Sequence, residues 1–143
     1  MKNDVGIFRV AVCAIILDTQ NRILLTQRSL KRDHHPGDWE VMSGRLAQGE
    51  DFIEALHREV AEELGIEVEI VAPIGTFHFY RGTEKAEHVG VNYLCRYKSG
   101  EVKVDGIEEI AFRWASLEDA LEIVKDESIK MAIKSTQEYL KLL

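Results

Sequence analysis

The sequence contains little of several residue types that mark special classes of protein. It has only two cysteines and two prolines, too few for a disulfide scaffold or a proline-rich disordered chain. Its longest apolar run, Val10–Leu17, is too short to span a membrane. Met1–Asp4 does not begin a signal peptide. We therefore expect a chain of the reducing cytoplasm that does not enter a membrane.

Basic residues are also scarce relative to acidic ones. There are 18 Lys and Arg against 25 Asp and Glu, which gives a net charge of −7. Stable nucleic-acid binding needs a basic face, so this balance argues against it. An acidic protein that handles phosphates needs another source of positive charge, and a bound metal ion supplies one.

What is present is typical of a globular domain. Of the 143 residues, 45% are hydrophobic and 30% charged, which predicts one domain over residues 1–143 with its own core. The cysteines, Cys13 and Cys95, lie far apart in apolar runs. We expect both to be small buried hydrophobes on strands rather than a disulfide or a metal site.

Hydrophobic periodicity predicts strands that alternate with three helices. The expected strands are 5–17, 22–27 (forming a hairpin with the first), 39–41, 66–80 with a break near Ala72–Pro73, 88–97, 101–104 and 110–115. Polar loops are expected at 28–38, 42–50 and 81–87, and helices at 52–64, 117–124 after a Ser116 cap, and 129–142. This mixture indicates an α/β fold, with a mixed sheet between helices on both faces.

The chain is organised around the stretch Gly44–Ile66. Asp51 is a good helix N-cap and Gly65 a good C-terminal stop. At about 100° per residue, one arc of the helix between them is apolar and predicts a core-facing stripe of Phe52, Ile53, Leu56, Val60 and Leu64.

An adjoining arc of the same helix gathers Glu59, Glu62 and Glu63. Like charges at these spacings repel, and a divalent cation would turn the repulsion into attraction. Clustered oxygen ligands suit Mg²⁺ or Mn²⁺ rather than zinc. The alternative for the three carboxylates alone is a solvated acidic face, which is common on glutamate-rich helices.

The whole stretch fits the pattern G-x5-E-x7-R-E-U-x-E-E-x-G-U, where U is aliphatic, and so resembles the signature of the Nudix (MutT-like) hydrolase superfamily. The matching residues are Gly44, Glu50, Arg58, Glu59, Val60, Glu62, Glu63, Gly65 and Ile66. The resemblance implies a Nudix α/β/α sandwich that uses Mg²⁺, or Mn²⁺, to hydrolyse a pyrophosphate linkage. The implied substrate is a nucleoside diphosphate linked to another moiety: a nucleoside triphosphate, a nucleotide sugar or a dinucleotide. A homodimer is a further family-level expectation.

The resemblance also implies roles for individual residues. Glu59, Glu62 and Glu63 would be metal ligands, together with the carbonyl of Ser43. Many relatives carry a further glutamate before a strand that ends in Arg-Trp, where it binds metal or acts as general base. Here that residue is Glu108, with Glu109 as the alternate. The catalytic set is therefore Glu62, Glu63 and Glu108, and an exposed loop acid is the alternative for Glu108.

The remaining residues implied by the resemblance support the loop or the substrate. Gly44, Glu50 and Arg58 would fix the loop geometry, through a Glu50–Arg58 ion pair. Arg28 would contact substrate, as an arginine at the end of the second strand does in some relatives. Arg45 is a second substrate-binding candidate because it flanks the site in sequence. The ordinary interpretation of these two, and of the nearby Lys31 and Arg32, is solvated surface charge. The sequence departs from many relatives in carrying Ser43 for a glycine and Ala47 for a glutamate.

Two other functions fit the same fold. The segments Gln27–Ser29 and Pro36–Trp39 faintly resemble isopentenyl diphosphate isomerases, but those enzymes need a cysteine in the loop before the box, where this chain has none. A non-catalytic nucleotide regulator would tolerate loss of box acids, yet all are present. Four aromatic residues can stack a base or fill the core: Trp39, Phe79, Tyr80 and Tyr93. The histidines lack zinc-like spacing.

Overall fold

The computed structural model describes residues 5–143. Its helices are α1 (Phe52–Leu64), α2 (Leu117–Ile123) and α3 (Glu127–Lys141). Its strands are β1 (Arg9–Leu17), β2 (Ile23–Arg28), β3 (Trp39–Glu40), β4 (Met42–Arg45), β5 (Ile66–Arg81), β6 (Ala86–Gly100) and β7 (Glu109–Ala115). Among these residues, none of the helices has the length and apolarity needed to cross a membrane.

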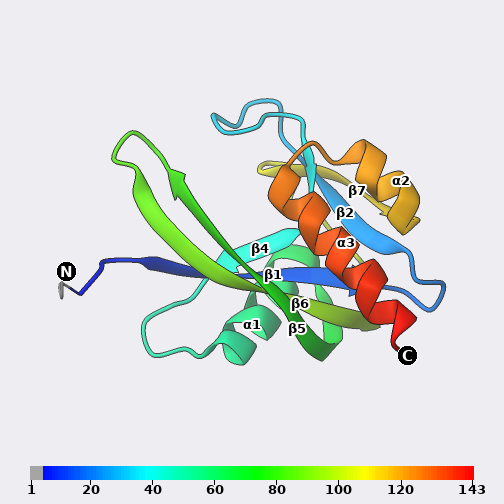
Figure 1. Ribbon diagram of the computed structural model, residues 1–143. Helices are drawn as coiled ribbons and strands as arrows, with labels where there is room; N and C mark the ends of the chain where they lie inside the picture. The colour runs from blue at the N-terminus through cyan, green and yellow to red at the C-terminus, as the bar shows by residue number, and fades with distance from the viewer. Residues whose placement is uncertain (1–4) are drawn as a thin grey trace.

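The strands form one mixed sheet with β1 at its centre. β1 runs parallel to β6, from Arg9 opposite His88 to Leu17 opposite Arg96. All other pairs are antiparallel: β2 and β4 with β1, β3 and β7 with β2, and β5 with β6. α1 lies on one face of the sheet, and α2 and α3 cover the other (Figure 1). The predicted α/β/α sandwich is confirmed.

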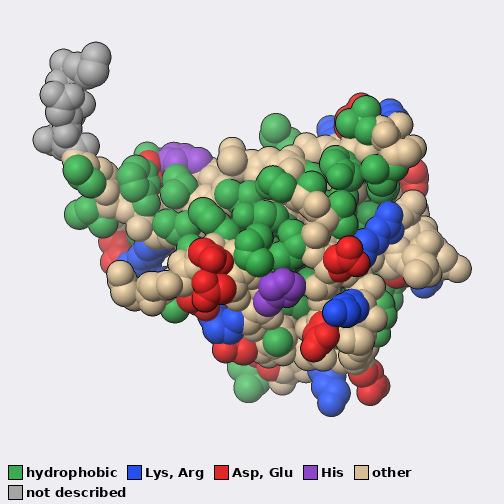
Figure 2. All heavy atoms as spheres, turned by 90° about the horizontal axis from the view of Figure 1, so that it is seen from below, with side chains coloured by type: hydrophobic (Ala, Val, Ile, Leu, Met, Phe, Trp, Pro, Cys, Tyr) green, Lys and Arg blue, Asp and Glu red, His purple; other side chains and the backbone are tan. Residues whose placement is uncertain are grey.

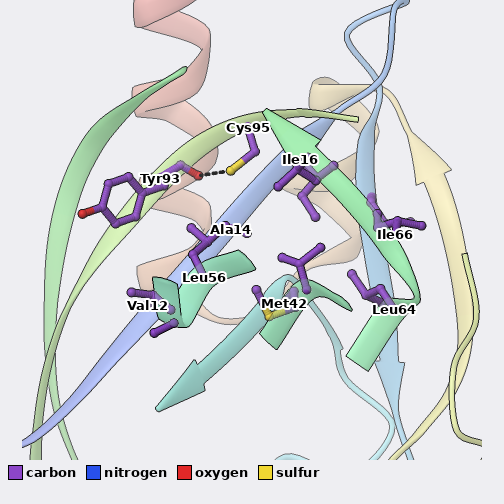
Figure 3. Packing of buried hydrophobic residues seen from close by; sticks show 13 residues of the cluster. Val12, Ala14, Ile16, Met42, Leu56, Leu64, Ile66, Tyr93 and Cys95 are labelled. Carbon is purple, nitrogen blue, oxygen red and sulfur yellow. Dashed lines mark hydrogen bonds between the residues drawn. The ribbon is translucent and has the colours of Figure 1, made fainter. Parts of the chain in front are cut away.

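Each face of the sheet buries its own apolar cluster. On one face, Leu56 and Leu64 of α1 pack against Val12, Ala14 and Ile16 of β1 (Figure 3). On the other, Ile133 of α3 packs with Ile15, Leu17 and Ile23 among others. At about 25 cal/mol per Å² of buried apolar surface, these two clusters are the main stabilising contribution to the fold.

The two cysteines behave as small buried hydrophobes, as predicted. Cys13 lies on β1 and Cys95 on β6, and both thiols are free and buried. Burial raises the pKa of each to about 12, so both stay protonated near neutral pH.

The box helix begins and ends where the sequence predicts. The Asp51 side chain accepts a hydrogen bond from the Glu54 amide at 2.8 Å, and Gly65 ends α1 with φ +70°. Leu56, Val60 and Leu64 are buried. Ile53 is not part of the core-facing stripe, because 43% of it is exposed.

Several predicted strand limits were wrong. β1 begins at Arg9 rather than residue 5, and Val5 and Ile7 are 94% and 93% exposed. The β1–β2 hairpin exists, but its ladder is only the pair Leu17 and Ile23. Residues 42–45 of the expected loop form β4, and residues 101–104 are not a strand.

β5 crosses the predicted break without interruption, since register shifts near Ala72 and Pro73 absorb it. The expected loop 81–87 shrinks to a short turn, so β5 and β6 form a long hairpin that projects beyond the sheet (Figure 1). Arg9, at the start of β1, contacts Glu84 near the tip at 3.1 Å. α2 matches its prediction with Ser116 as N-cap, and α3 begins at Glu127, two residues earlier than expected.

Candidate active site

A cleft of about 550 Å³ collects most of the predicted site residues. It lies where β4, α1, the loop before β7 and the tip of the β5–β6 hairpin meet. Its walls carry both acids and bases, and the predicted residues among them are Arg28, Ser43, Gly44, Arg45, Glu59, Glu63, Glu108 and Glu109. Residues from four separate parts of the chain are thus brought into one cavity.

Gly44 is needed in β4 because Glu59 passes directly over it. A Cβ built on Gly44 would lie 2.3 Å from Cδ of Glu59 and 2.5 Å from its Oε2. Any other residue would push this carboxylate away. Gly44 therefore leaves the space that the Glu59 carboxylate occupies.

Arg58 and Glu50 form the expected ion pair. Nε and Nη2 of Arg58 donate to the two Glu50 oxygens at 2.6 and 2.7 Å, and Nη2 also donates to the Arg45 carbonyl at 3.1 Å. Glu50 in turn accepts from the Ala47 amide. Arg58 holds the pKa of Glu50 down at about 2, with help from that amide. This bidentate arrangement fixes the loop to the helix.

The carboxylates of the helix differ in position. Glu59 is mostly buried at the cleft, where it also accepts from Nη1 of Arg58 at 2.8 Å. Glu63 lines the same cleft. Glu62 does not line it; its side chain is 60% exposed and contacts Arg58 at 3.2 Å. The three acids are neighbours on the helix, but only two of them face the cavity.

The cleft gathers carboxylates, the ligand type that hard divalent cations prefer. Burial raises the pKa of Glu63, and the nearby charges of Glu59 and Glu108 raise it further. A cation would relieve this repulsion between carboxylates. Among residues 5–143, no three acidic, histidine or cysteine side chains yet converge with coordinating geometry. A cation held here would need the side chains of Glu63 and Glu108 to turn towards Glu59.

Asp105, which the sequence analysis overlooked, organises the loop that carries Glu108. Its Oδ1 accepts from the amides of Ile107, Glu108 and Glu109 at 2.8 to 3.1 Å. These bonds lower the pKa of the Asp105 carboxyl. The Asp-Gly pair at this turn was the available sequence signal.

Arg28 is not a solvated surface charge, so that interpretation is wrong for this residue. Only 6% of it is exposed. Its Nε donates to the His34 carbonyl at 2.8 Å and its Nη1 to Glu40 at 3.1 Å. Its Nη2 is fully enclosed and lacks a hydrogen-bond partner within residues 5–143. This guanidinium is rigidly held beside the cleft with one donor unused.

Glu109 is the second buried group beside Arg28. It lies opposite Arg28 in the β2–β7 ladder and 3.5 Å from Arg32. Burial and the contact with Glu40 raise the pKa of Glu109 to about 9, although Arg32 and Arg28 act in the opposite direction. Glu109 is therefore protonated at neutral pH, which relieves its repulsion with the Glu40 carboxylate.

This raised pKa makes stability depend on pH. Between pH 4.5 and about 9 the folded chain keeps a proton on Glu109 that the unfolded chain releases. The free energy of unfolding therefore falls as pH rises through this range. We expect Glu109→Gln to remove that loss, making the variant more stable than wild type by about 2 kcal/mol at pH 9 and nearly equal at pH 5. Urea unfolding at the two pH values measures this, and equal differences at both would contradict it.

A second cavity of about 320 Å³ adjoins the cleft. The two share Arg28, Glu40, Ser43 and Phe79 among their lining residues. Aromatic and histidine side chains dominate the second cavity: Trp39, Phe77, Phe79, Tyr80, His34, His35 and His78. Of the four aromatics noted in the sequence, Trp39, Phe79 and Tyr80 line this pocket, and Tyr93 belongs to the core.

Comparison with known proteins places the fold and site in context. A family model described as the NUDIX domain matches residues 7–134. The isopentenyl-diphosphate Delta-isomerase of Clavibacter michiganensis subsp. michiganensis is 39% identical over 81 residues, which are 56% of this chain and 41% of the relative. A human 8-oxo-dGDP phosphatase is 43% identical over 58 residues, 41% of this chain and 17% of that protein. This chain thus spans less than half of either relative.

Among solved structures, a MutT Nudix hydrolase from Burkholderia pseudomallei superimposes with a TM-score of 0.75. It is 27% identical, and the alignment covers 91% of this chain and 98% of that one. The agreement over nearly the whole length extends the likeness well beyond the box.

Proposed function

Because the chain belongs to the Nudix family, we propose that it hydrolyses a pyrophosphate linkage in a nucleoside diphosphate linked to another moiety. The observation that carries the proposal is the pairing of two cavities. A cleft that holds Glu59 and Glu63 adjoins an aromatic pocket of about 320 Å³, which is within the range of small-molecule sites. The substrate would be a nucleoside triphosphate, a nucleotide sugar or a dinucleotide.

The proposed cation is Mg²⁺, with Mn²⁺ as a substitute. Glu59, Glu63 and the carbonyl of Ser43 would hold it, and Glu62 would join them by turning away from Arg58. When bound, Mg²⁺ would neutralise phosphate charge and make a water molecule more acidic. Gly44, Glu50 and Arg58 keep the first carboxylate and the loop in place.

The other residues of the cleft would bind the substrate phosphates or accept the proton of the attacking water. Arg28 lines the cleft and would hold its positive charge beside the substrate phosphates, and Arg45 of β4 lines the same cleft. Glu108, carried on the loop that Asp105 fixes, is the proposed general base that takes the proton of the attacking water. Its exposure leaves it free to reach that water.

The proposal extends to the setting of the protein. We propose a single domain over residues 1–143 that works in the cytoplasm, where its two free thiols stay reduced. A homodimer is supported by the hydrophobic side chains that gather on the face seen from below, with charged side chains along the lower part of that face (Figure 2). Small nucleotides would be its ligands, without a nucleic-acid partner.

The test is a substrate panel scored by release of phosphate and pyrophosphate. Purified protein is incubated with nucleoside triphosphates, dinucleotides and nucleotide sugars, with Mg²⁺ and then with a chelator. We expect Mg²⁺-dependent turnover of at least one class and none with the chelator. Absence of turnover throughout the panel, with Glu63→Gln indistinguishable from wild type, would refute the proposal.

A second candidate is favoured by the likeness to isopentenyl-diphosphate Delta-isomerases. Cys13 lines the aromatic pocket, but it lies on β1 and not in the loop before the box. Its pKa of about 12 also keeps it a thiol. We therefore rank isomerisation below hydrolysis. Adding isopentenyl diphosphate to the panel and following double-bond migration by NMR decides between the two.

A further inference from the structure

Asn92 is a buried amide on the wall of the aromatic pocket. It lies on β6 between Cys13 of β1 and Gly75 of β5, and only 6% of it is exposed. Its Nδ2 is 3.9 Å from the position that a Cβ on Gly75 would take. The neighbouring strand therefore leaves space next to the amide instead of covering it.

Within residues 5–143, the Asn92 side chain makes no hydrogen bond to the protein. Only Arg28 Nη2 and Glu109 Oε2 are fully enclosed side-chain nitrogen or oxygen atoms without a partner. The amide atoms of Asn92 must therefore open onto the cavity. Atoms that open onto a cavity can hydrogen-bond to a molecule bound there, and this amide offers such a molecule both a donor and an acceptor.

Several aromatic side chains line the pocket around this amide. Trp39 and Phe77 contribute aromatic surface to it, and Phe79 stacks on His88 with ring centroids 4.7 Å apart. Aromatic side chains of this kind bind planar heterocycles by stacking. Stacking tolerates every base, so any choice among bases must come from a polar group in the pocket.

We propose that Asn92 is a specificity-determining residue that reads the hydrogen-bonding edge of the substrate's nucleobase. An amide presents one N–H donor and one carbonyl acceptor side by side. It therefore matches a ring edge that carries an acceptor beside a donor. This inference rests on the proposed function, since it assumes that the nucleoside enters the aromatic pocket while the diphosphate occupies the acidic cleft.

Two substitutions test the role. Asn92→Leu keeps the size and removes both hydrogen bonds, and Asn92→Asp replaces the donor by a second acceptor. We expect the ratio of kcat/KM between the preferred and the disfavoured base to fall about tenfold in the Leu variant. The change should appear in KM, while kcat is retained. We expect the Asp variant to shift preference towards guanine, because its N1–H and N2–H₂ are two adjacent donors.

Thr136→Val is the matched control. Thr136 is buried on the same side of the sheet but does not line the pocket, so the base ranking should stay as in wild type. Calorimetric titration with the four nucleoside monophosphates gives a second readout that does not need hydrolysis, and thermal melts confirm folding.

These experiments distinguish failure of the Asn92 role from failure of the proposed hydrolase function. If wild type prefers certain bases and both Asn92 variants keep the same ranking in turnover and in monophosphate binding, Asn92 does not read the base, although hydrolysis stands. If wild type neither hydrolyses nor binds any nucleotide, the proposed function fails and this inference with it.

Discussion

Glu59→Gln or Glu63→Gln should lower Mg²⁺-dependent turnover by about 10³-fold, roughly 4 kcal/mol of transition-state stabilisation. Both carboxylates line the acidic cleft, and Glu59 is fitted against Gly44. An amide of nearly the same shape removes one ligand charge and leaves the helix intact. Because the proposed cation neutralises the substrate and acidifies water, its loss should affect every substrate alike.

Three measurements check this expectation. Turnover is followed with saturating substrate, Mg²⁺ affinity by calorimetry, and stability by the shift of Tm on adding Mg²⁺. The control is Glu69→Gln, which changes an exposed residue of β5 outside the cleft and should behave as wild type. Glu62→Gln should lose only about tenfold, since its carboxylate must first leave Arg58. Full activity and an unchanged Mg²⁺ shift in Glu63→Gln would contradict the assignment.

The same substitution should have the opposite effect on the metal-free fold. Burial and neighbouring carboxylates raise the pKa of Glu63, so ionising this group costs more free energy in the folded chain than in the unfolded chain. Removing that charge relieves repulsion. In chelator, the Tm of Glu63→Gln should therefore equal or exceed that of wild type. Lower activity with undiminished stability distinguishes loss of a ligand from misfolding.

Local sequence was sufficient to predict the box helix. Asp51 caps it and Gly65 ends it, because capping depends on the residues at the ends and little else. The order of strands and helices along the chain was likewise sufficient to predict the α/β/α layers. Helix ends and the type of each element depend on residues close together in the sequence, so they can be predicted from the sequence alone.

Strand limits were less predictable because partners elsewhere in the chain decide them. Residues 5–8 are as apolar as β1, yet the parallel ladder with β6 begins only at Arg9 opposite His88. Met42–Arg45 resemble a loop in sequence, but they form a strand because they pair with β1. Such choices depend on contacts between distant segments, which local periodicity does not contain.

The same reason explains what was missed in the candidate site. Arg28 resembles a surface residue, but the β2–β7 pairing buries it near Glu40 and Glu109. Glu108 and Glu109 are equivalent in the local sequence, which does not show that Glu109 is enclosed. In the structure, Glu108 lies on the exposed loop and Glu109 begins β7, so two adjacent acids have opposite surroundings.

Gly44→Ala should reduce turnover by about 10²-fold while the protein stays folded. Alanine can adopt the backbone of Gly44, whose φ is not in the left-handed region. Its Cβ, however, would occupy the space of the Glu59 carboxylate, at 2.3 Å from Cδ. Glu59 must then move by about an ångström, and misplacement of that size costs on the order of 10²-fold in rate.

Gly65→Ala provides the contrast, because this glycine serves the backbone and not the site. With φ +70° and the nearest atom, the Glu101 carbonyl oxygen, 3.6 Å from a built Cβ, alanine here is strained but not obstructed. It should cost about 1–2 kcal/mol of stability and leave turnover per folded molecule near wild type. Turnover and urea unfolding of both variants measure the effects on activity and on stability separately. Normal Mg²⁺ affinity and rate in Gly44→Ala would show that Glu59 does not need the space beside Gly44.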